Sequence, residues 1–382
     1  MGLSSASEFS VDIVTRVVQP DEDIYIVQPG SSYWLYETFK ANNHIFLDFP
    51  ALPLTFSTPA PDDKTLRQMV VRSLAMGEWI DSGKQGKQPS QLLSDYVGKD
   101  SRKRLGRYVG AIKRLYWDLK PGAIIVVPGR RFYDEVMIGE IVGVPTMYSA
   151  AQIYGGETVP ARKVRWLRSK PRSAFSAELR DKFGKPNPLT QLDRSLRVEI
   201  LRAGYDQYVF DNEFTVRLNT TEDDFTTLDD YNIQTFVNYV GGILIAVELG
   251  RTDKISFEEA IRLLRDHPDL VPDLKQSINS IGFQRLVAAT VKPLVIGVLL
   301  TAATAPAAAG AAQPVPAMVT VTNSAAPPDD PCTIHVAARV EGAMKLMKLD
   351  DWRRVCESAR DAKAATGLST TMKAKPRKRL TP

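Results

Sequence analysis

The sequence is poor in the residues that most often bind metals or act as nucleophiles. Its 382 residues include only three histidines and two cysteines. Cys332 and Cys356 both lie near the C-terminal end and suggest no disulfide framework, as is usual in a reducing cytoplasm. Cys332 and His335 are close in sequence, but two ligands do not make a zinc site. We therefore expect no metal site and no cofactor.

The motifs of common hydrolases and nucleotide-binding enzymes are also missing. No G-x-S-x-G nucleophile elbow occurs. Gly77 and Gly83-Lys84 have the wrong spacing for a phosphate loop, and Gln85 stands where a serine or threonine would bind magnesium. Residues 1–10 lack the basic and apolar regions of a signal peptide. The sequence favours a cytoplasmic, non-catalytic protein, with membrane association as an alternative discussed below.

Charge is unevenly distributed along the chain. The net charge is +5 and the isoelectric point is near 9.0, which permits an anionic partner without requiring one. Lysines and arginines cluster in residues 102–131 and again in residues 162–172. Such clusters are usually solvated surface, but two of them in one domain favour a ligand that carries phosphate.

Residues 105–167 alternate between helix and strand signals and organise the first half of the chain. Val109, Ile112 and Leu115 repeat at helical intervals, and a Pro-Gly pair then ends the helix. Gly139 lies inside a later strand, where it indicates a bulge or a close backbone approach. The expected elements are a helix over residues 108–119, strands over 123–127, 136–142 and 162–166, and a basic turn over 128–131.

The flanking residues predict further elements of the same domain. Ser31 or Ser32 is expected to cap a helix that carries Leu35 and Phe39, and a Gly-Lys-Pro-Asn-Pro break marks the end of the domain. The other expected elements are strands over residues 24–27 and 44–49 and helices over residues 63–81, 90–97 and 175–183.

This pattern resembles the EVE-like branch of the PUA superfamily, in the form found at the N-terminus of Mrr-like restriction-system proteins. The resemblance covers residues 10–185, about half of the chain. It is carried by Tyr116-Trp117, Lys120-Pro121-Gly122, residues 138–142, Arg165-Trp166-Leu167 and the opening segment 24–50. It implies an α+β fold class, in which a small bent β-barrel with helices is followed by a mainly α-helical C-terminal domain.

The resemblance also implies a ligand pocket, because proteins of this type generally hold a flipped or modified base among aromatic side chains. Asp48 would accept a hydrogen bond from an exocyclic amine, and Arg130 and Arg131 are the phosphate candidates. The alternative is that most of these aromatic residues belong to the core, since large rings usually supply burial. The implied pocket residues are Ser31, Tyr33, Trp34, Asp48, Phe49, Trp117 and Tyr148.

The second half changes to helical patterns. Residues 190–320 are expected to form a mainly helical domain, although residues 208–210 and 214–218 suggest strands. Ser256 and Glu259 form a capping box. Residues 283–303 read as a buried helix before an Ala/Pro linker over 305–328. Residues 321–382 are expected to hold a helical segment, 336–359, and a basic disordered tail that includes Lys373, Lys375, Arg377, Lys378 and Arg379.

Three functional hypotheses follow. The first is a sensor and effector protein of a prokaryotic restriction or antiviral-defence type, whose first domain binds a nucleic acid with a modified base, or a nucleotide. The second is a membrane-disrupting effector that uses the apolar residues 233–247 and 285–312. The third is a divergent magnesium-dependent restriction nuclease, which the missing Glu-x-Lys element disfavours. The sequence leaves the oligomeric state open.

Overall fold

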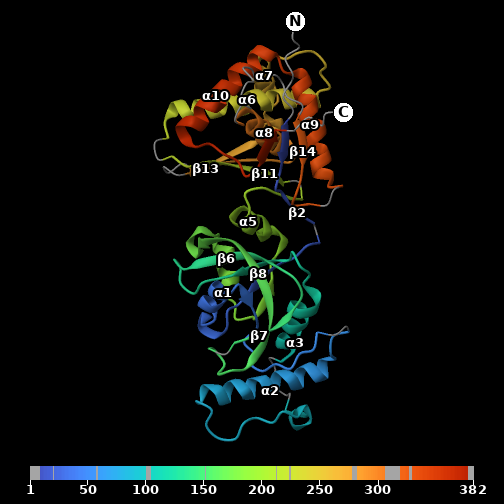
Figure 1. The fold of residues 1–382 in the computed structure, drawn as a ribbon, viewed down its shortest axis with the longest axis vertical. Coiled ribbons are helices and arrows are strands. Elements are labelled where there is room, and N and C mark those ends of the chain that lie inside the picture. The colour runs from blue at the N-terminus through green and yellow to red at the C-terminus, as the bar shows by residue number, and fades with distance from the viewer. Residues whose placement is uncertain are drawn as a thin grey trace. The chain divides into compact units, whose positions relative to one another are not determined.

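The chain forms two compact units in the computed structural model (Figure 1). The central unit is residues 21–205, and the terminal unit combines residues 1–20 with residues 206–382. Both mix helices and strands, so the chain as a whole is an α and β protein. The structure describes residues 9–19, 21–56, 59–99, 105–150, 152–211, 213–222, 225–277, 282–305, 319–326 and 329–376.

The central unit is built on a curled sheet with the strand order β4-β8-β6-β5-β3-β9, and β7 pairs with β8. β3 runs parallel to β5, whereas the other pairs are antiparallel. Its strands are β3 Ile24–Val27, β4 His44–Ile45, β5 Ile124–Val127, β6 Glu135–Ile141, β7 Thr146–Ser149, β8 Thr158–Pro171 and β9 Leu189–Gln191.

Gly139 bends this sheet. The pairing of β6 with β8 shifts register between Ile138 and Gly139. A Cβ atom at Gly139 would lie 2.6 Å from a methyl group of Val164 and 2.8 Å from the Trp166 ring. The predicted bulge with close approach is therefore confirmed, and it explains why a glycine stands inside this strand.

Helices close the central unit around its buried cluster. Asp62 caps α2 by accepting a hydrogen bond from the Thr65 amide, which agrees with the predicted helix over residues 63–81. Neither Ser31 nor Ser32 caps α1 through its side chain, so that prediction is wrong. The helices are α1 Tyr36–Asn42, α2 Asp63–Asp81, α3 Leu105–Lys113, α4 Ala177–Phe183 and α5 Arg194–Gly204, with single turns at η1 Ser31–Tyr33, η2 Leu93–Tyr96 and η4 Arg172–Ala174 and a π-turn η3 at Arg114–Asp118.

The terminal unit has two sheets. One has the order β12-β13-β11-β10-β2 and the other β14-β1-β15. The N-terminal strands therefore complete one sheet whose other strands come from residues 319–376 and another whose other strands come from residues 208–288. The strands are β1 Phe9–Asp12, β2 Arg16–Val18, β10 Tyr208–Phe210, β11 Glu213–Thr220, β12 Asp273–Ser277, β13 Gly282–Ala288, β14 Val319–Thr322 and β15 Lys373–Pro376.

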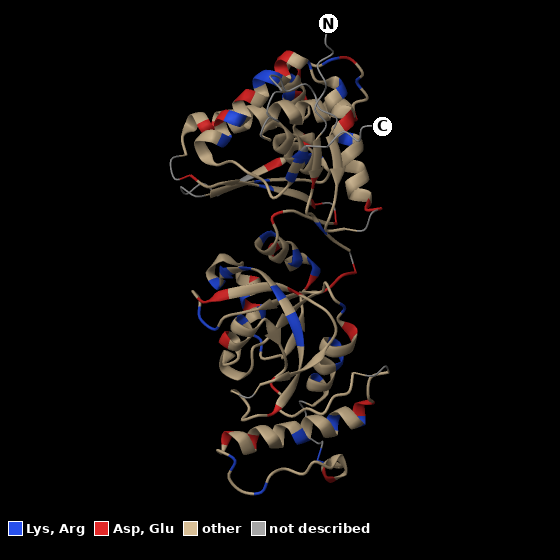
Figure 2. Cartoon of the chain, in the orientation of Figure 1, with Lys and Arg blue, Asp and Glu red and all other residues tan. Residues whose placement is uncertain are grey.

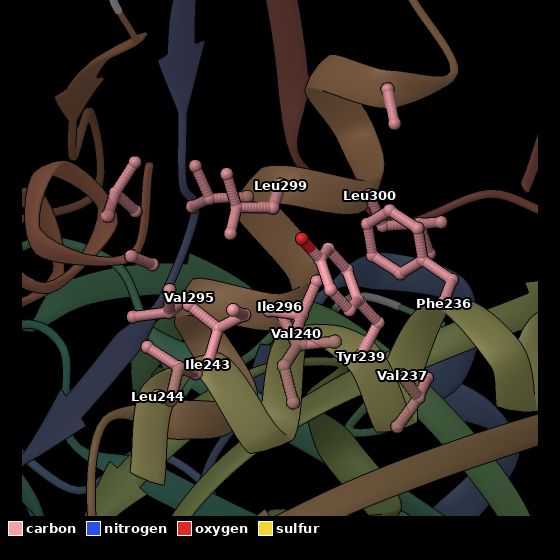
Figure 3. Close-up of a cluster of buried hydrophobic side chains, with 14 of the residues drawn as sticks. Phe236, Val237, Tyr239, Val240, Ile243, Leu244, Val295, Ile296, Leu299 and Leu300 are labelled. Atoms are coloured by element: carbon pink, nitrogen blue, oxygen red, sulfur yellow. The ribbon is translucent and has the colours of Figure 1, made fainter. Parts of the chain in front are cut away.

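A long helix that is mostly buried from Ile233 onward forms the centre of the terminal unit. This is α6, which starts at a Thr226–Asp229 capping box and packs its apolar middle against α8 (Figure 3). Phe236, Tyr239 and Val240 of α6 belong to one buried cluster with Ile296 and Leu299 of α8. The helices are α6 Thr227–Glu248, α7 Phe257–Asp266, α8 Lys292–Ala303, α9 Pro331–Leu346 and α10 Leu349–Thr366, with a single turn at η5 Pro268–Leu270.

The terminal unit contains more strand than the sequence predicted. The strands at residues 208–210 and 214–218 and the Ser256–Glu259 capping box are confirmed. The predicted helix over residues 283–303 is wrong in its first part, since Gly282–Ala288 is a strand. Lys373 and Lys375 lie in β15 rather than in a tail without structure. The predicted tail residues 377–382 and linker residues 306–318 lie outside the described residues.

The domain boundaries also differ from the predicted ones. The expected first domain ended at residue 185, but α5 belongs to the central unit. Residues 9–12 and 16–18, which the prediction placed at the edge of the first domain or before it, pair within the terminal unit. Within the described residues, no helix combines the length and the apolar character needed to span a bilayer. The apolar residues from Ile233 to Ala246 of α6 and from Leu294 to Leu300 of α8 are buried in the terminal unit.

Candidate functional site

The central unit contains a cleft of about 440 Å³. One side is formed by the segment after β3 and the segment after β4, the other by the C-terminal half of α2, and Tyr154 of the β7–β8 loop closes one part of the wall. The lining residues are Ser31, Trp34, Asp48, Pro50, Ser73, Leu74, Gly77, Glu78, Ile80, Asp81 and Tyr154.

The segment that leads into the cleft has an unusual backbone. Gly30, Ser32 and Tyr33 all have positive φ angles, of 72°, 54° and 65°. This conformation disfavours residues other than glycine and is often found at ligand sites. Gly30 cannot be replaced without rearrangement, because a Cβ atom there would lie 2.5 Å from Trp34 Nε1. The Tyr33 hydroxyl holds the segment by donating to the Phe183 carbonyl oxygen at 2.8 Å.

Trp34, Asp48 and Tyr154 form a connected group in the cleft wall. Trp34 Nε1 donates to Asp48 Oδ2 at 2.9 Å, and the Tyr154 hydroxyl donates to Asp48 Oδ1 at 2.6 Å. The two rings meet edge to face, with centroids 5.7 Å apart. Trp34 is 45% exposed and Tyr154 is 4% exposed. The group therefore fixes the position of an indole ring that remains accessible to a ligand.

Burial, and after it the negative charge of Asp48, raises the pKa of Tyr154 well above its usual value. The Tyr154 phenol therefore stays protonated at neutral pH and donates its hydrogen bond to Asp48. Because Trp34 is also a neutral donor, these contacts orient the carboxylate of Asp48 without neutralising its charge.

The far wall is α2, which is tied to both neighbouring segments. Ser73 Oγ donates to the Pro50 carbonyl oxygen at 2.7 Å, and Arg72 Nη1 donates to the Ala51 carbonyl oxygen at 2.8 Å. At the end of the helix, Lys84 Nζ donates to the Gly155 carbonyl oxygen at 2.7 Å. These bonds set the width of the cleft, because they fix α2 against the loop that carries Tyr154.

The cleft has an acidic lining. The charged side chains among its described lining residues are Asp48, Glu78 and Asp81, and this set includes neither lysine nor arginine. Glu78 and Asp81 belong to the C-terminal end of α2, where acidic residues are visible in Figure 2. Asp81 also contributes to the raised pKa of Tyr154, after the larger effects of burial and of Asp48. The negative charge of Asp81 therefore acts on the Tyr154 side of the cleft.

Of the residues implied by the resemblance, the structure brings Ser31, Trp34 and Asp48 together in this cleft. The other members of the implied pocket lie elsewhere. Tyr33 lies next to the cleft but bonds to Phe183. Tyr148 stacks on His44, with ring centroids 4.7 Å apart.

Phe49 and Trp117 belong to the packing of the central unit. Phe49 is 4% exposed and meets Tyr108 edge to face at 5.2 Å, so the core alternative holds for it. Trp117 lies against Phe56 and Tyr116, with centroids 6.5 Å from each. The π-turn that carries Trp117 thus does not border the cleft. Residues of α2 line the cleft where the resemblance implied Trp117.

Arg130 and Arg131 are exposed on the turn between β5 and β6. Arg172 fixes this turn by donating to the carbonyl oxygens of Gly129 and Arg130 at 3.1 and 3.2 Å. Phe132 and Tyr133 follow in the chain and are 50% and 80% exposed. The turn presents two cations and two aromatic rings to solvent, a combination suited to a phosphate backbone with bases.

Sequence reasoning did not select Tyr154, Glu78 or Asp81 for the site. In the sequence, Tyr154 is one of several aromatic residues near loops of the first domain. Glu78 and Asp81 are three residues apart on α2, beside Leu74 and Gly77 on the same face. Two acidic residues on this face indicate that it is not part of the apolar core. The sequence does not show which other segment lies opposite this face.

Within the described residues, no group of three or more histidine, cysteine, aspartate or glutamate side chains is arranged to hold a metal ion. Burial raises the pKa of Cys356 to about 12 and that of Cys332 to about 11. Comparison of the chain with protein-family models, with curated proteins and with solved structures gave no match.

Proposed function

We propose that the central unit binds a flat heterocyclic group, a modified base or a nucleotide, in the cleft. The observation that carries this proposal is the accessible indole of Trp34, whose edge is held by Asp48 and Tyr154. Stacking of a base on an aromatic ring is worth ~1–3 kcal/mol. A ring that is already fixed loses little conformational entropy when the ligand arrives.

The phosphate groups of such a ligand stay outside the cleft in this proposal, because its lining is acidic. The exposed Arg130 and Arg131 supply cations on the same unit. α4 is common to both regions. Its C-terminal Phe183 accepts the hydrogen bond of Tyr33, and the cation of Arg180 lies 5.4 Å from the Phe132 ring centre.

We further propose that base recognition by the central unit is the sensor step of a restriction or antiviral-defence protein, and that the terminal unit passes the signal on. This placement rests on the resemblance to EVE-like domains rather than on a feature of the terminal unit. The sensor itself performs no reaction in this proposal, because the residues of the cleft are suited to hold and orient a ring.

Calorimetric titration with modified and unmodified nucleosides and oligonucleotides tests the binding proposal. Trp34→Ala removes the stacking surface, and we expect it to weaken binding of a modified base by roughly ten- to a hundredfold. Trp34 is nearly half exposed, so the fold should survive the change. Trp117→Ala is the matched control, because it removes an indole that lies outside the cleft. Equal, fully salt-sensitive binding of all oligonucleotides by the parent and by both variants contradicts the proposal.

A further inference from the structure

We propose that the cleft selects a heterocycle that carries a positive charge over a neutral one of the same shape. This inference rests on the proposed function and specifies its ligand class. It joins two features of the cleft, the partly exposed indole of Trp34 and the acidic lining formed by Asp48, Glu78 and Asp81. An aromatic face and nearby carboxylates are the two groups that most favour an organic cation.

Asp48 keeps its negative charge available to a ligand. Its two oxygens each accept one hydrogen bond, from Trp34 at 2.9 Å and from Tyr154 at 2.6 Å, and both donors are neutral. A carboxylate oxygen has a second lone pair, so each can accept another bond. Asp48 is half-buried at the edge of the indole, where water screens its charge less than it does on an open surface.

Two carboxylates of α2, Glu78 and Asp81, line the same cleft as Asp48. The charge of Asp81 also reaches Tyr154, because it helps to raise the pKa of that phenol after the larger effects of burial and of Asp48. A neutral ligand would gain little from these three carboxylates, whereas a cation would be attracted by each of them. These carboxylates also disfavour a ligand that places phosphate inside the cleft.

The basic side chains of α2 and its C-terminal turn that approach this region are directed to other partners. Lys84 Nζ donates to the Gly155 carbonyl oxygen at 2.7 Å and lies 5.6 Å from the centre of the Trp79 ring. Arg72 donates to the Ala51 carbonyl oxygen and to Gln91. Their bonds anchor the helix, and neither residue lines the cleft.

The size of the cleft suits a small organic ligand. A volume of about 440 Å³ is in the range of sites for small organic ligands. The ligand class that fits is a base made cationic by N-alkylation or by protonation, stacked on Trp34 with its N–H groups or its cationic edge directed to Asp48 and Asp81.

Two isomeric nucleosides separate charge from shape. 1-Methyladenosine carries a positive charge on its ring at neutral pH, whereas N6-methyladenosine has the same composition and is neutral. We expect calorimetry on the full chain at low salt to show at least about tenfold tighter binding of the cationic isomer. The preference should shrink as potassium chloride is added, because salt screens the carboxylates.

Asp81→Asn and Glu78→Gln test which charges produce the preference. Each removes one carboxylate at the exposed end of α2, and we expect the ratio between the isomers to fall several-fold in each variant. Asp63→Asn is the matched control, because Asp63 lies at the other end of the same helix and should leave the ratio unchanged. Melting curves show that each variant is folded.

The outcomes distinguish this inference from the proposed function. If both isomers bind equally and Trp34→Ala weakens both, the cleft binds a base but does not select its charge, and the inference is overturned. If neither isomer nor any modified oligonucleotide binds, both ideas fail. A charge preference that survives the loss of Asp81 and of Glu78 separately and together would also overturn the inference.

Discussion

Adjacent glycines in α6 show how a single atom sets the approach of two helices. A Cβ atom at Gly242 would lie 2.2 Å from the Ala260 carbonyl oxygen of α7. At Gly241 the nearest atom would be a methyl group of Leu264 at 3.4 Å. Gly242 is therefore a contact point between backbones, while Gly241 faces the end of a side chain that can move.

We expect Gly242→Ala to lower the free energy of unfolding by about 3 kcal/mol or more, because two backbones must separate. Gly241→Ala is the control and should stay within about 1 kcal/mol of the parent, since alanine also favours the helix. Urea denaturation followed by circular dichroism measures both changes. Similar losses in the two variants would show that the α6–α7 contact is not as close as the structure has it.

The resemblance groups Ser31, Trp34 and Asp48, which the structure brings into one cleft, although their neighbours Tyr33 and Phe49 do not line it. Ser31 and Trp34 follow the first strand of the central unit, and Asp48 follows the second, so the resemblance was enough to group them. Tyr154 and Asp81 reach the same cleft from distant segments. Their contribution depends on how α2 and the β7–β8 loop pack, and no local pattern encodes that contact.

At the scale of elements, β8 and the π-turn η3 depend on one buried cation. Arg162 is 1% exposed and donates to the carbonyl oxygens of Leu115, Leu119 and Gly143 at 2.8 to 3.0 Å. Its guanidinium thus satisfies backbone groups that the end of the helix leaves free. The sequence suggested a solvated basic cluster here, and for Arg162 that suggestion is wrong.

We expect Arg162→Met to destabilise the central unit by at least about 3 kcal/mol, because three carbonyl groups lose a donor. Lys163→Met is the control. Lys163 is the next residue of β8 and is exposed, so its replacement should change stability by less than about 0.5 kcal/mol. Thermal unfolding of both variants provides the comparison, and an Arg162→Met protein as stable as the control would contradict this role.

The sequence did not predict the correct secondary structure where apolar residues repeat at neither the helical nor the strand interval. β13 was expected to be the start of a helix. Its polar residues Gln284 and Arg285 are 1% and 3% exposed, so buried and exposed positions do not alternate along the strand. By contrast, α2 and α7 have capping residues at their starts and periodic apolar faces, and both were predicted.

At the scale of the whole molecule, the terminal unit depends on the beginning of the chain. β1 is the middle strand of the sheet β14-β1-β15, and β2 is the edge strand beside β10. Val11 and Ile13 are fully buried in the core of this unit. The sequence pattern does not predict these pairings, because β1 pairs with strands near the other end of the chain and β2 with a strand near its middle, whereas periodicity reports on neighbouring residues.

Removal of residues 1–20 should therefore destabilise the terminal unit, to which they belong, and leave the central unit folded. Each fully buried Val or Ile side chain contributes ~1.5–3 kcal/mol, and β14 and β15 would also lose their common partner. We expect residues 206–382 to become protease-sensitive in the truncated chain, while residues 21–205 stay resistant and still bind the ligand of the cleft. Val11→Asp in the full chain should act in the same direction, with Ser10→Asp as the milder control, since Ser10 is only half-buried. Protection of residues 206–382 in the truncated chain would mean that the terminal unit folds without its first strands.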